Sequence, residues 1–330
     1  MRQRVSVIIT VLNEADSVTA LLDSLLAQTR APDEIVVVDG GSSDGTVEIL
    51  NGYAARAAVP VRVLVRPGSN ISQGRNIAIE QANGPIIASA DAGVRLEVDW
   101  LDRLTRPFDA ENPPDVVSGF FLADPTNMFE LVLGAVTLPT VQEIDSEAFH
   151  PSSRSVAYTR EAYQAVGGYP EWLDYCEDLL FDFALRDAGY RFIFVPEAIV
   201  HFRPRPTLPA FCKQYYRYAR GDGKADFWRY RHAIRYGTYA ALVVFILLAA
   251  LHHPLWLLPF CGALIGTLCA PYKRLASHLE ELSRRDRVVA MLWAPVIRWT
   301  GDIAKMIGYP VGVWWRWRHA PKASWPKRQF

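Results

Sequence analysis

The amino-acid sequence predicts an α/β protein with a doubly wound sheet, followed by a helical region at a membrane. Over about the first 100 residues, short runs rich in valine and isoleucine alternate with segments whose leucines recur at helical spacing, the order typical of βαβ units and a parallel sheet. Two apolar runs then lie close together in the C-terminal part. With 330 residues, half of them hydrophobic, the chain has enough material for one large core or two smaller ones.

Charge is distributed unevenly along a chain whose formal net charge is zero. Residues 1–200 carry 14 Lys and Arg against 29 Asp and Glu, whereas residues 201–330 carry 21 against 6. The acidic part suits a metal or polar-ligand site, and the basic part suits an anionic surface such as a phospholipid headgroup layer. Because the basic part is also strongly apolar, we expect membrane lipids and no nucleic acid among its partners.

The cysteines show no C-x-x-C spacing, which is typical of free thiols in a reducing compartment. They are Cys176, Cys212, Cys261 and Cys269. The apolar run Val5–Leu12 reaches Asn13 too soon for a signal peptide and lacks a small-residue cleavage site. We therefore expect the N-terminal part to stay in the cytoplasm.

Six buried strands are predicted from runs of apolar and β-branched residues that end in turn signals. They are Val5–Val11, Ile35–Val38, Val61–Val65, Ile86–Ala90, Val116–Phe121 and Tyr190–Val195. Helices are predicted between the first four, over Val18–Leu26 with Asp16 or Ser17 placed to cap it, over Thr46–Ala57, and from the segment Ser69–Ala78. The span Asp124–Ser153, with three prolines, is expected to be irregular and to face an acceptor.

The strand Ile35–Val38 runs directly into a loop of glycine, serine and aspartate that ends at Thr46. In open α/β sheets, ligands bind beyond the carboxyl ends of the strands, where this loop presents Asp39 and Asp44. The loop has neither the lysine of a P-loop nor the G-x-G-x-x-G fingerprint. Carboxylates there suit a base, a ribose or a metal ion, and the alternative is a solvated turn that caps the next helix.

A second carboxylate follows a neighbouring strand of the predicted sheet. Ile86–Ala90 delivers Asp91 to the same edge as Asp39, because the carboxyl ends of parallel strands lie together. The two residues are therefore placed to share one ligand, unless each only caps the loop that follows it.

Four blocks at these strand ends are similar to the family 2 glycosyltransferases with the GT-A fold: Val7–Glu14, Val36–Thr46, Gly74-Arg75-Asn76 and Asp91-Ala92-Gly93. The resemblance implies a GT-A-type doubly wound mixed sheet and a nucleotide-sugar donor. It implies that Asp39 holds the base, Asp91 the ribose or the metal–diphosphate region, and that Arg75 and Asn76 border the donor. The donor-binding residues implied are Thr10, Leu12, Glu14, Asp39, Asp44, Gly74, Arg75, Asn76 and Asp91.

The resemblance also implies a divalent metal, Mg²⁺ or Mn²⁺, near Asp91. The family's D-x-D motif normally has a second carboxylate where this chain has Gly93, so the metal is held less securely. A hard cation takes much of its coordination shell from substrate phosphates and water, so one protein carboxylate is compatible with binding. His201 is a possible further ligand, and a structural histidine at a strand end is the alternative.

The stretch Val166–Phe181 contains a Gly-Gly-Tyr turn and then Glu177-Asp178 at the start of a helix predicted to end at Gly189. A helix N-terminus stabilises carboxylates in their charged form, although a simple capping pair looks the same. In the family that this stretch resembles, the position carries the catalytic base. The resemblance therefore implies that Asp178 is the base and that Glu177 supports it.

These residue types fit sugar transfer. A carboxylate takes the proton of the acceptor hydroxyl as it attacks, and positive charge from a metal, Arg or Lys stabilises the departing diphosphate. One base and one displacement invert the anomeric carbon, as the family resemblance also implies.

After the predicted strand ends, Gln214-x-x-Arg217-Tyr218 is similar to the Q-x-x-R-W motif of processive membrane synthases, with Tyr in place of Trp. On one helix these side chains suit contacts with an acceptor sugar and a diphosphate. An aromatic helix lying on a membrane surface is the alternative, and no processivity follows from the motif.

Two apolar runs, Tyr239–Leu251 and Leu255–Ala270, are separated by His252-His253-Pro254. Each is shorter than the about 20 residues of an ordinary spanning helix, so we expect a hairpin of two short spans or a re-entrant one. Arginines before the pair and Lys273-Arg274 after it predict that both ends are cytoplasmic. From Val288 to Trp317, tryptophans alternate with basic residues, which favours an interfacial helix over a buried soluble subdomain.

We therefore expect a GT-A catalytic domain over residues 1–225 and a membrane-associated helical region over residues 226–330, with an apolar hairpin at about 237–270 and an interfacial segment at about 288–318. The predicted function is an inverting, hexosyl-type transfer from a nucleotide sugar to a lipid-linked or glycan acceptor at the cytoplasmic face of a membrane. A non-catalytic nucleotide-sugar-binding subunit and a nucleotidyltransferase are the alternatives. No oligomeric state is predicted.

Overall fold

The computed structural model describes residues 2–319, which form two compact units. The first unit ends at Asp124 and resumes over Pro139–Arg203. The second comprises Pro125–Leu138 and the chain from Pro204 onward. The chain therefore passes between the units after Asp124, after Leu138 and after Arg203, and the domain boundary at residue 225 stays a prediction.

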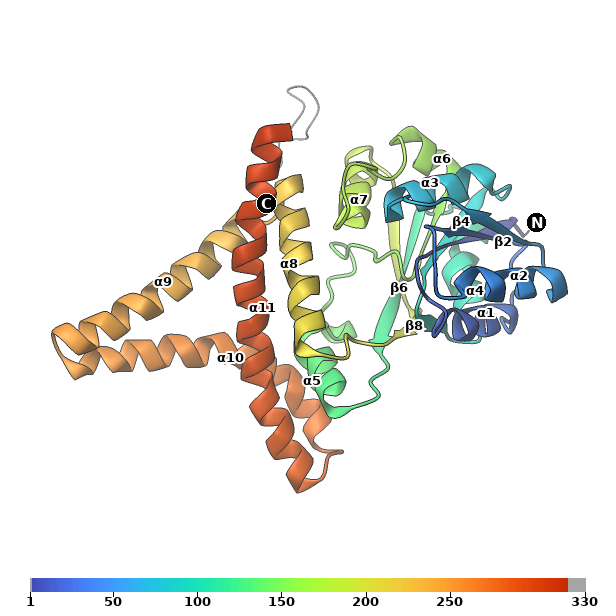
Figure 1. The fold of residues 1–330 in the computed structure, drawn as a ribbon. Coiled ribbons are helices and arrows are strands. Elements are labelled where there is room, and N and C mark those ends of the chain that lie inside the picture. Colours follow the sequence, from blue (N-terminus) through green and yellow to red (C-terminus); the bar gives the residue numbers. More distant parts are fainter. Residues whose placement is uncertain (1, 320–330) are drawn as a thin grey trace. The chain divides into compact units, whose positions relative to one another are not determined.

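The first unit is built on an eight-stranded mixed sheet of order β3-β2-β1-β4-β7-β6-β8-β5 (Figure 1). The strands β3, β2, β1 and β4 are parallel, and β7 is antiparallel to both of its neighbours. This confirms the predicted doubly wound mixed sheet. The strands are β1 Val5–Val11, β2 Glu34–Asp39, β3 Val61–Val65, β4 Ile86–Asp91, β5 Val94–Leu96, β6 Val116–Ala123, β7 Val156–Thr159 and β8 Phe192–Phe202.

Helices cover both faces of this sheet (Figure 1). Alternate residues of a strand point to opposite faces, so Val7 and Ile9 of β1 join one core cluster and Ile8 joins the other. The first cluster includes α1 Val18–Leu26, α2 Thr46–Arg56 and α4 Trp100–Thr105, and the second includes α3 Ile71–Gln81, α6 Arg160–Ala165 and α7 Glu177–Asp187. Short 3₁₀ turns lie at Arg106–Asp109 and Val141–Glu143.

The expectation of an irregular span over Asp124–Ser153 was wrong for its first part. Met128–Thr137 forms helix α5, which begins at Asn127, whose side chain accepts from the Glu130 N–H at 2.9 Å. Its buried residues join a core cluster of the second unit. Prolines lie on both sides of this helix and not within it, where a proline would remove a backbone hydrogen bond.

The second unit is helical, with α5, α8 Leu208–Ala225, α9 Arg229–Leu251, the turn η3 Pro254–Trp256, α10 Leu257–Leu279 and α11 Arg284–His319. Helices α8 and α11 pack so closely that glycines are required. A Cβ at Gly308 would lie 2.2 Å from the Tyr216 carbonyl oxygen, and one at Gly312 would lie 2.1 Å from that of Arg220. The predicted interfacial segment is therefore part of a 36-residue helix whose small residues are buried on one face.

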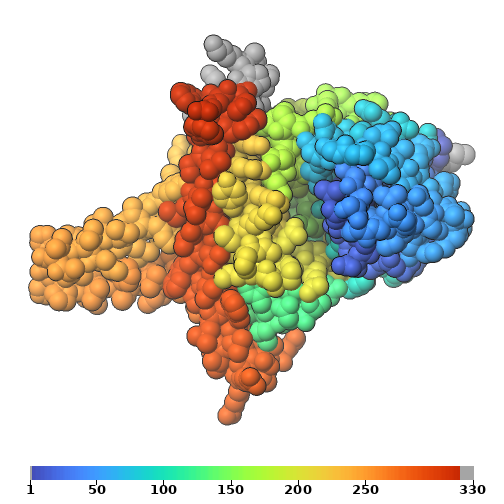
Figure 2. All heavy atoms as spheres, in the orientation of Figure 1, coloured from blue at the N-terminus to red at the C-terminus, as the bar shows by residue number. Residues whose placement is uncertain are grey.

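Two helices of the second unit have the length and composition of membrane spans, Arg229–Leu251 and Pro254–Leu279. They form a hairpin that projects from the α8–α11 pair (Figure 2). Only 6% and 11% of their most apolar windows are buried, unlike the core helix of a soluble protein. The helices are longer than the two apolar runs suggested, because the polar residues that flank the runs are also helical.

Candidate active site

The carboxyl ends of three parallel strands bring the predicted donor residues to one edge of the sheet. In the strand register, Val11 of β1 lies opposite Asp39 of β2, and Thr10 lies opposite Asp91 of β4. Because β1 is the central strand of the three, Thr10 lies between the two carboxylates. The sequence-based placement of Asp39 and Asp91 at one edge is what the structure shows.

Asp39 is fully buried and organises the loop that follows it. Its Oδ1 accepts from the backbone N–H groups of Gly41 and Ser42, each at 2.8 Å, and its Oδ2 accepts from the Ser42 hydroxyl. The Ser42 hydroxyl oxygen in turn accepts from the Asn13 N–H at 2.7 Å. This carboxylate therefore fixes the backbone of the loop that follows β2.

Asp44 connects the same loop to the end of β1. Its carboxylate accepts from the N–H groups of Ala15 and Thr46, each at 3.1 Å, and the Thr46 hydroxyl donates to it, which lowers the pKa of Asp44. The Glu14 N–H donates to that hydroxyl oxygen at 2.9 Å. The neighbouring Leu12 side chain is exposed, and its contact with a donor stays a prediction.

Helix α3 meets this edge at its first turn, which is closed by a capping box of Asn70 and Gln73. Gly74 permits the approach, because a Cβ there would lie 2.8 Å from the Thr10 Cγ2. The close packing of α3 on β1 places the next residue, Arg75, beside the ends of the strands.

Arg75 bridges two carboxylates from different elements. Its Nη2 lies 2.8 Å from Asp91 Oδ1, at the end of β4, and its Nη1 lies 2.7 Å from Glu177 Oε1, at the start of α7. The guanidinium also lies over the Tyr169 ring at 5.2 Å. The arginine side chain is only 3% exposed, so removal of either carboxylate would leave a charge poorly compensated.

The ion pairs of Arg75 affect the pKa values of the residues that form them. Burial lowers the pKa of Arg75, but Asp91 and Glu177 outweigh this effect and raise it, so the guanidinium is charged. Burial and the adjacent Asp178 carboxylate raise the pKa of Glu177 to about 7, against the lowering effect of Arg75. Glu177 therefore takes up a proton close to neutral pH.

Asp178 lies in the first turn of α7, half-buried, and its Oδ1 accepts from the Leu179 N–H at 2.8 Å. The residue before the pair, Cys176, has a left-handed backbone (φ 65°) that turns the chain sharply into the helix. The structure therefore brings Asp91, Arg75, Glu177 and Asp178 into one connected group.

Asn76 is used differently from its neighbour. Its amide oxygen accepts from the Tyr169 N–H at 2.9 Å and the Tyr163 hydroxyl at 3.0 Å. Its amide nitrogen donates to the Tyr169 carbonyl and to Glu171 Oε1, each at 3.0 Å. The side chain thus holds the turn after Gly168 against α3, and its contact with a donor stays a prediction.

Two residues near the group were missed by the sequence analysis. Arg154 lies just before β7, with its Nε 3.9 Å from Asp91 Oδ2 and its guanidinium over the Phe202 ring. Asp182 lies one turn after Asp178 and is buried, and its Oδ2 has no hydrogen-bond partner among residues 2–319. Burial and the nearby Asp178 carboxylate raise the pKa of Asp182 well above its usual range, against the lowering effects of Arg186 and Arg75. The i, i+4 spacing from Asp178 was the available signal for Asp182.

The described residues contain no cluster of three or more His, Cys, Asp or Glu side chains placed to hold a metal ion. His201 pairs with Glu97 through Nε2. Gly93 has a left-handed backbone (φ 75°) where the D-x-D motif has its second carboxylate. Asp91, 26% exposed, presents a carboxylate at the strand end, with Oδ1 2.8 Å from Arg75 and Oδ2 3.9 Å from Arg154. The described residues thus fit a metal that is held mainly by the donor's phosphates. They do not form a metal site made of protein ligands alone.

The three residues of the Q-x-x-R-W-like motif lie on α8, in the second unit. The Gln214 Nε2 donates to the Tyr218 hydroxyl at 2.8 Å, as side chains four residues apart on a helix can do. Their contact with an acceptor stays a prediction, as does that of Arg217.

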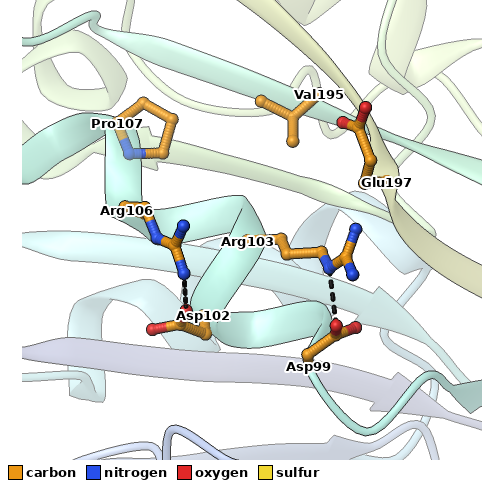
Figure 3. A pocket seen from close by; sticks show the side chains of 7 residues that line it. All are labelled: Asp99, Asp102, Arg103, Arg106, Pro107, Val195 and Glu197. Atoms are coloured by element: carbon orange, nitrogen blue, oxygen red, sulfur yellow. Dashed lines mark hydrogen bonds and ion pairs between the residues drawn. The ribbon is translucent and has the colours of Figure 1, made fainter.

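A separate cleft of about 470 Å³ opens beside α4 and β8 (Figure 3). Its wall carries the ion pairs Asp99–Arg103 at 2.6 Å and Asp102–Arg106 at 2.7 Å, one turn apart on the helix. None of the predicted site residues lines it.

Comparison with known proteins agrees with this geometry. The model of glycosyl transferase family 2 matches residues 6–156, and that of glycosyl transferase family group 2 matches residues 146–301. The succinoglycan biosynthesis protein ExoA of Rhizobium meliloti is 28% identical over 68% of this chain and 70% of its own. Glycosyltransferase AglE of Haloferax volcanii is 28% identical over 68% of this chain and 74% of its own.

A solved structure, the mannosyltransferase PcManGT from Pyrobaculum calidifontis in complex with GDP-Man and Mn²⁺, has a TM-score of 0.58. It is 21% identical, and the match covers 96% of this chain and 88% of that one. The mixed sheet with carboxylates at its strand ends is thus a GT-A glycosyltransferase fold. The chain belongs to the family 2 glycosyltransferases, which decides against the nucleotidyltransferase alternative.

Proposed function

We propose that this glycosyltransferase moves a sugar from a nucleoside-diphosphate donor to a hydroxyl of a lipid-linked or polysaccharide acceptor, with inversion at the anomeric carbon. The Arg75 bridge carries the proposal, because it joins Asp91 at the donor edge to Glu177, the residue before the candidate base. The relative named for succinoglycan biosynthesis and the fold neighbour bound to GDP-Man support a glycan acceptor and a nucleotide-sugar donor.

Asp178 is the proposed base. Its carboxylate takes the proton from the acceptor hydroxyl as that oxygen bonds to the anomeric carbon and the bond to the diphosphate breaks. The N-terminus of α7 favours the charged form of this carboxylate. A single displacement from the face opposite the leaving group inverts the configuration.

Glu177 is proposed to position the base. Its carboxylate is fixed by Arg75 at 2.7 Å, and the adjoining Asp178 is thereby held at the first turn of the helix. Preorganised groups of this kind lower the barrier because they need no rearrangement during the reaction.

Asp91 and Arg154 are proposed to face the departing diphosphate. Arg154 lies 3.9 Å from Asp91, so a cation accompanies the carboxylate at the end of β4. Mg²⁺ or Mn²⁺ brought with the donor would take Asp91 as a ligand and would neutralise charge on the diphosphate.

The second unit is proposed to attach the enzyme to a membrane. Helices α9 and α10 have the length and composition of spans, and arginines at the start of α9 favour cytoplasmic ends for the hairpin. The catalytic unit then acts on the cytoplasmic face. Gln214, Arg217 and Tyr218 on α8 are proposed to contact the acceptor or the diphosphate.

The test is release of nucleoside diphosphate from UDP-, GDP- and dTDP-sugars by the full chain in detergent, with Mg²⁺ or Mn²⁺. We expect one donor class to be turned over and Asp178→Asn to lose about 10²-fold or more of the rate, the scale of a general base. Glu161→Gln, which removes an exposed carboxylate in the first turn of α6, is the matched control and should leave the rate unchanged. Equal rates for Asp178→Asn and the control would overturn the assignment.

A further inference from the structure

The second unit contains a cavity rich in arginine at the base of its apolar hairpin. The cavity has a volume of about 440 Å³ and lies among α9, α10 and α11. Arg231 and Arg235 come from α9 and Arg298 comes from α11. A smaller cavity of about 190 Å³ shares Arg298 and Asp302 with it and adds Arg274 and Lys305. We call the two together the cation pocket.

The positive charges of the cation pocket outnumber the negative ones. Among the described residues that line it are four arginines and one lysine, but a single carboxylate, that of Asp302. Asp222 also attracts Lys305 but lines neither cavity, and its carboxylate lies 3.1 Å from His232.

Asp302 is already engaged by its neighbours. Its side chain is 4% exposed, with Oδ1 2.8 Å from Arg235 Nε and Oδ2 3.0 Å from Arg298 Nε. The Tyr239 hydroxyl also donates to Oδ2 at 3.0 Å. Both carboxylate oxygens are therefore used, and one negative charge is shared by two guanidinium groups.

Lys305 is a further cation of this pocket, and its surroundings lower its pKa. Its ammonium lies over the Tyr215 ring at 4.5 Å. Burial and the nearby Arg235 lower its pKa to about 8, although Asp302 and Asp222 oppose the shift. Cations gathered at this density are costly unless an anion joins them.

The walls of the larger cavity indicate what kind of molecule carries that anion. Ile234, Ala263 and Gly266 line it beside the arginines, and the hairpin beyond it exposes large apolar side chains such as Val243 and Leu247. A molecule with an anionic end and an attached apolar chain can contact both the arginines and the apolar side chains.

We propose that the cation pocket binds the phosphate group of a membrane lipid, with the lipid chain lying along the α9–α10 hairpin. Guanidinium groups bind phosphate through paired hydrogen bonds and are preferred for this purpose. The site lies wholly within the second unit and does not depend on the transfer reaction. Its ligand is an anionic headgroup lipid or a phosphate-linked prenyl chain, which share this chemistry.

The test measures lipid retained by the detergent-purified full chain, by native mass spectrometry, without a sugar donor. The probes are phosphatidylglycerol, a prenyl phosphate, diacylglycerol as the uncharged lipid, and inorganic phosphate as competitor. The variant is Arg231→Gln/Arg298→Gln, and the control is Arg284→Gln/Arg285→Gln, which removes the same charge from the exposed start of α11 outside both cavities.

We expect the chain to retain one or both phosphate lipids and not diacylglycerol. The pocket variant should bind them about tenfold or more weakly, as loss of charge-assisted hydrogen bonds predicts, and the control should bind like the natural chain. Preference between the two lipids distinguishes a headgroup from a prenyl carrier. Equal lipid retention by the pocket variant and the control overturns the proposal. Binding of inorganic phosphate as tight as that of the phosphate lipids also overturns it, because the lipid chain would then contribute nothing to recognition.

Arg231→Gln alone guards against a folding defect, because this exposed side chain lies on the Trp228 ring and makes no bond to Asp302 in the described structure. It should lose part of the affinity with an unchanged helical circular dichroism spectrum. Full affinity in this variant, together with a misfolded double variant, would also count against the pocket. Because no donor is present, the result is separate from the outcome of the transfer assay.

Discussion

Arg75 Nη1 donates to Glu177 Oε1 at 2.7 Å, between residues 102 positions apart in the sequence. The same guanidinium donates to Asp91 at 2.8 Å. The carboxyl end of β4 and the N-terminus of α7 are therefore joined through a buried cation, and the donor edge and the proposed base depend on one side chain.

Loss of that cation should destabilise the first unit. Arg75→Met leaves the buried Glu177 without its cation and Asp91 with only the more distant Arg154, and should lower the free energy of unfolding by about 3–5 kcal/mol. Thermal unfolding in detergent measures the change. The double variant Arg75→Met/Glu177→Gln should recover part of the lost free energy of unfolding, because the buried Glu177 carboxylate is removed together with the Arg75 cation. A double variant less stable than Arg75→Met would show that the bridge is not the source of the effect.

The raised pKa of Glu177 predicts a dependence of stability on pH. Its folded pKa of about 7 lies above its ordinary value of 4.5, so the folded state holds the proton more tightly than the unfolded state. The stability from this group is full below pH 4.5 and is lost as the pH rises through about 7, by about 3 kcal/mol in total.

The comparison for this prediction is Glu177→Gln, which cannot titrate there. The difference in unfolding free energy between the natural chain and the variant should move against the natural chain between pH 5 and 8, as measured by denaturation at several pH values. A difference that is constant over this range would refute the pKa assignment.

Asn76 should contribute to stability through its complete set of hydrogen bonds. Asn76→Ala leaves the buried Tyr169 N–H without its partner and should cost about 1–3 kcal/mol. Asn112→Ala, at an exposed position, should cost less than about 0.5 kcal/mol. Similar melting temperatures for the two variants would contradict this role.

The contact of α8 with α11 should tolerate no side chain at its glycines. Gly312→Ala drives a methyl group against the Arg220 carbonyl and should destabilise the second unit by about 1–3 kcal/mol or more. Gly262→Ala on α10 has open space around the new methyl and should stabilise its helix by about 0.5–1 kcal/mol. Thermal melts followed by circular dichroism compare the two, and a neutral Gly312→Ala would mean that the helices are not in such close contact.

The local patterns of the sequence predicted six of the eight strands and the helices α1, α2, α3 and α7, but the short elements β5, β7, α4 and α6 were not predicted. Apolar runs rich in valine and isoleucine mark β1, β2 and β4, because strands that are buried on both faces have nearly continuous hydrophobic sequences. The same patterns placed Asp39 and Asp91 at one edge. Family resemblance supplied the roles that pattern alone left open.

The long-range pairs were not accessible in this way. No local signal joins Arg75 to Glu177 or Arg154 to Asp91, because each pair is made by strand order and helix packing. Helix α5 was missed because the prolines on both sides of it favoured an irregular span. Asp182 was missed because the burial of a polar residue depends on what packs over it. The packing of α11 on α8 was not predicted, because the tryptophans at other positions of α11 favoured an interfacial helix.

The measurement that tests the central claim most directly is the anomeric configuration of the sugar released when the enzyme hydrolyses its donor slowly, with water in place of the acceptor. Proton NMR of the first product, recorded before mutarotation, reports it. A single displacement assisted by Asp178 predicts an inverted sugar from the natural chain and little release from Asp178→Asn. A sugar of retained configuration would contradict the account, because it requires two displacements or front-face attack.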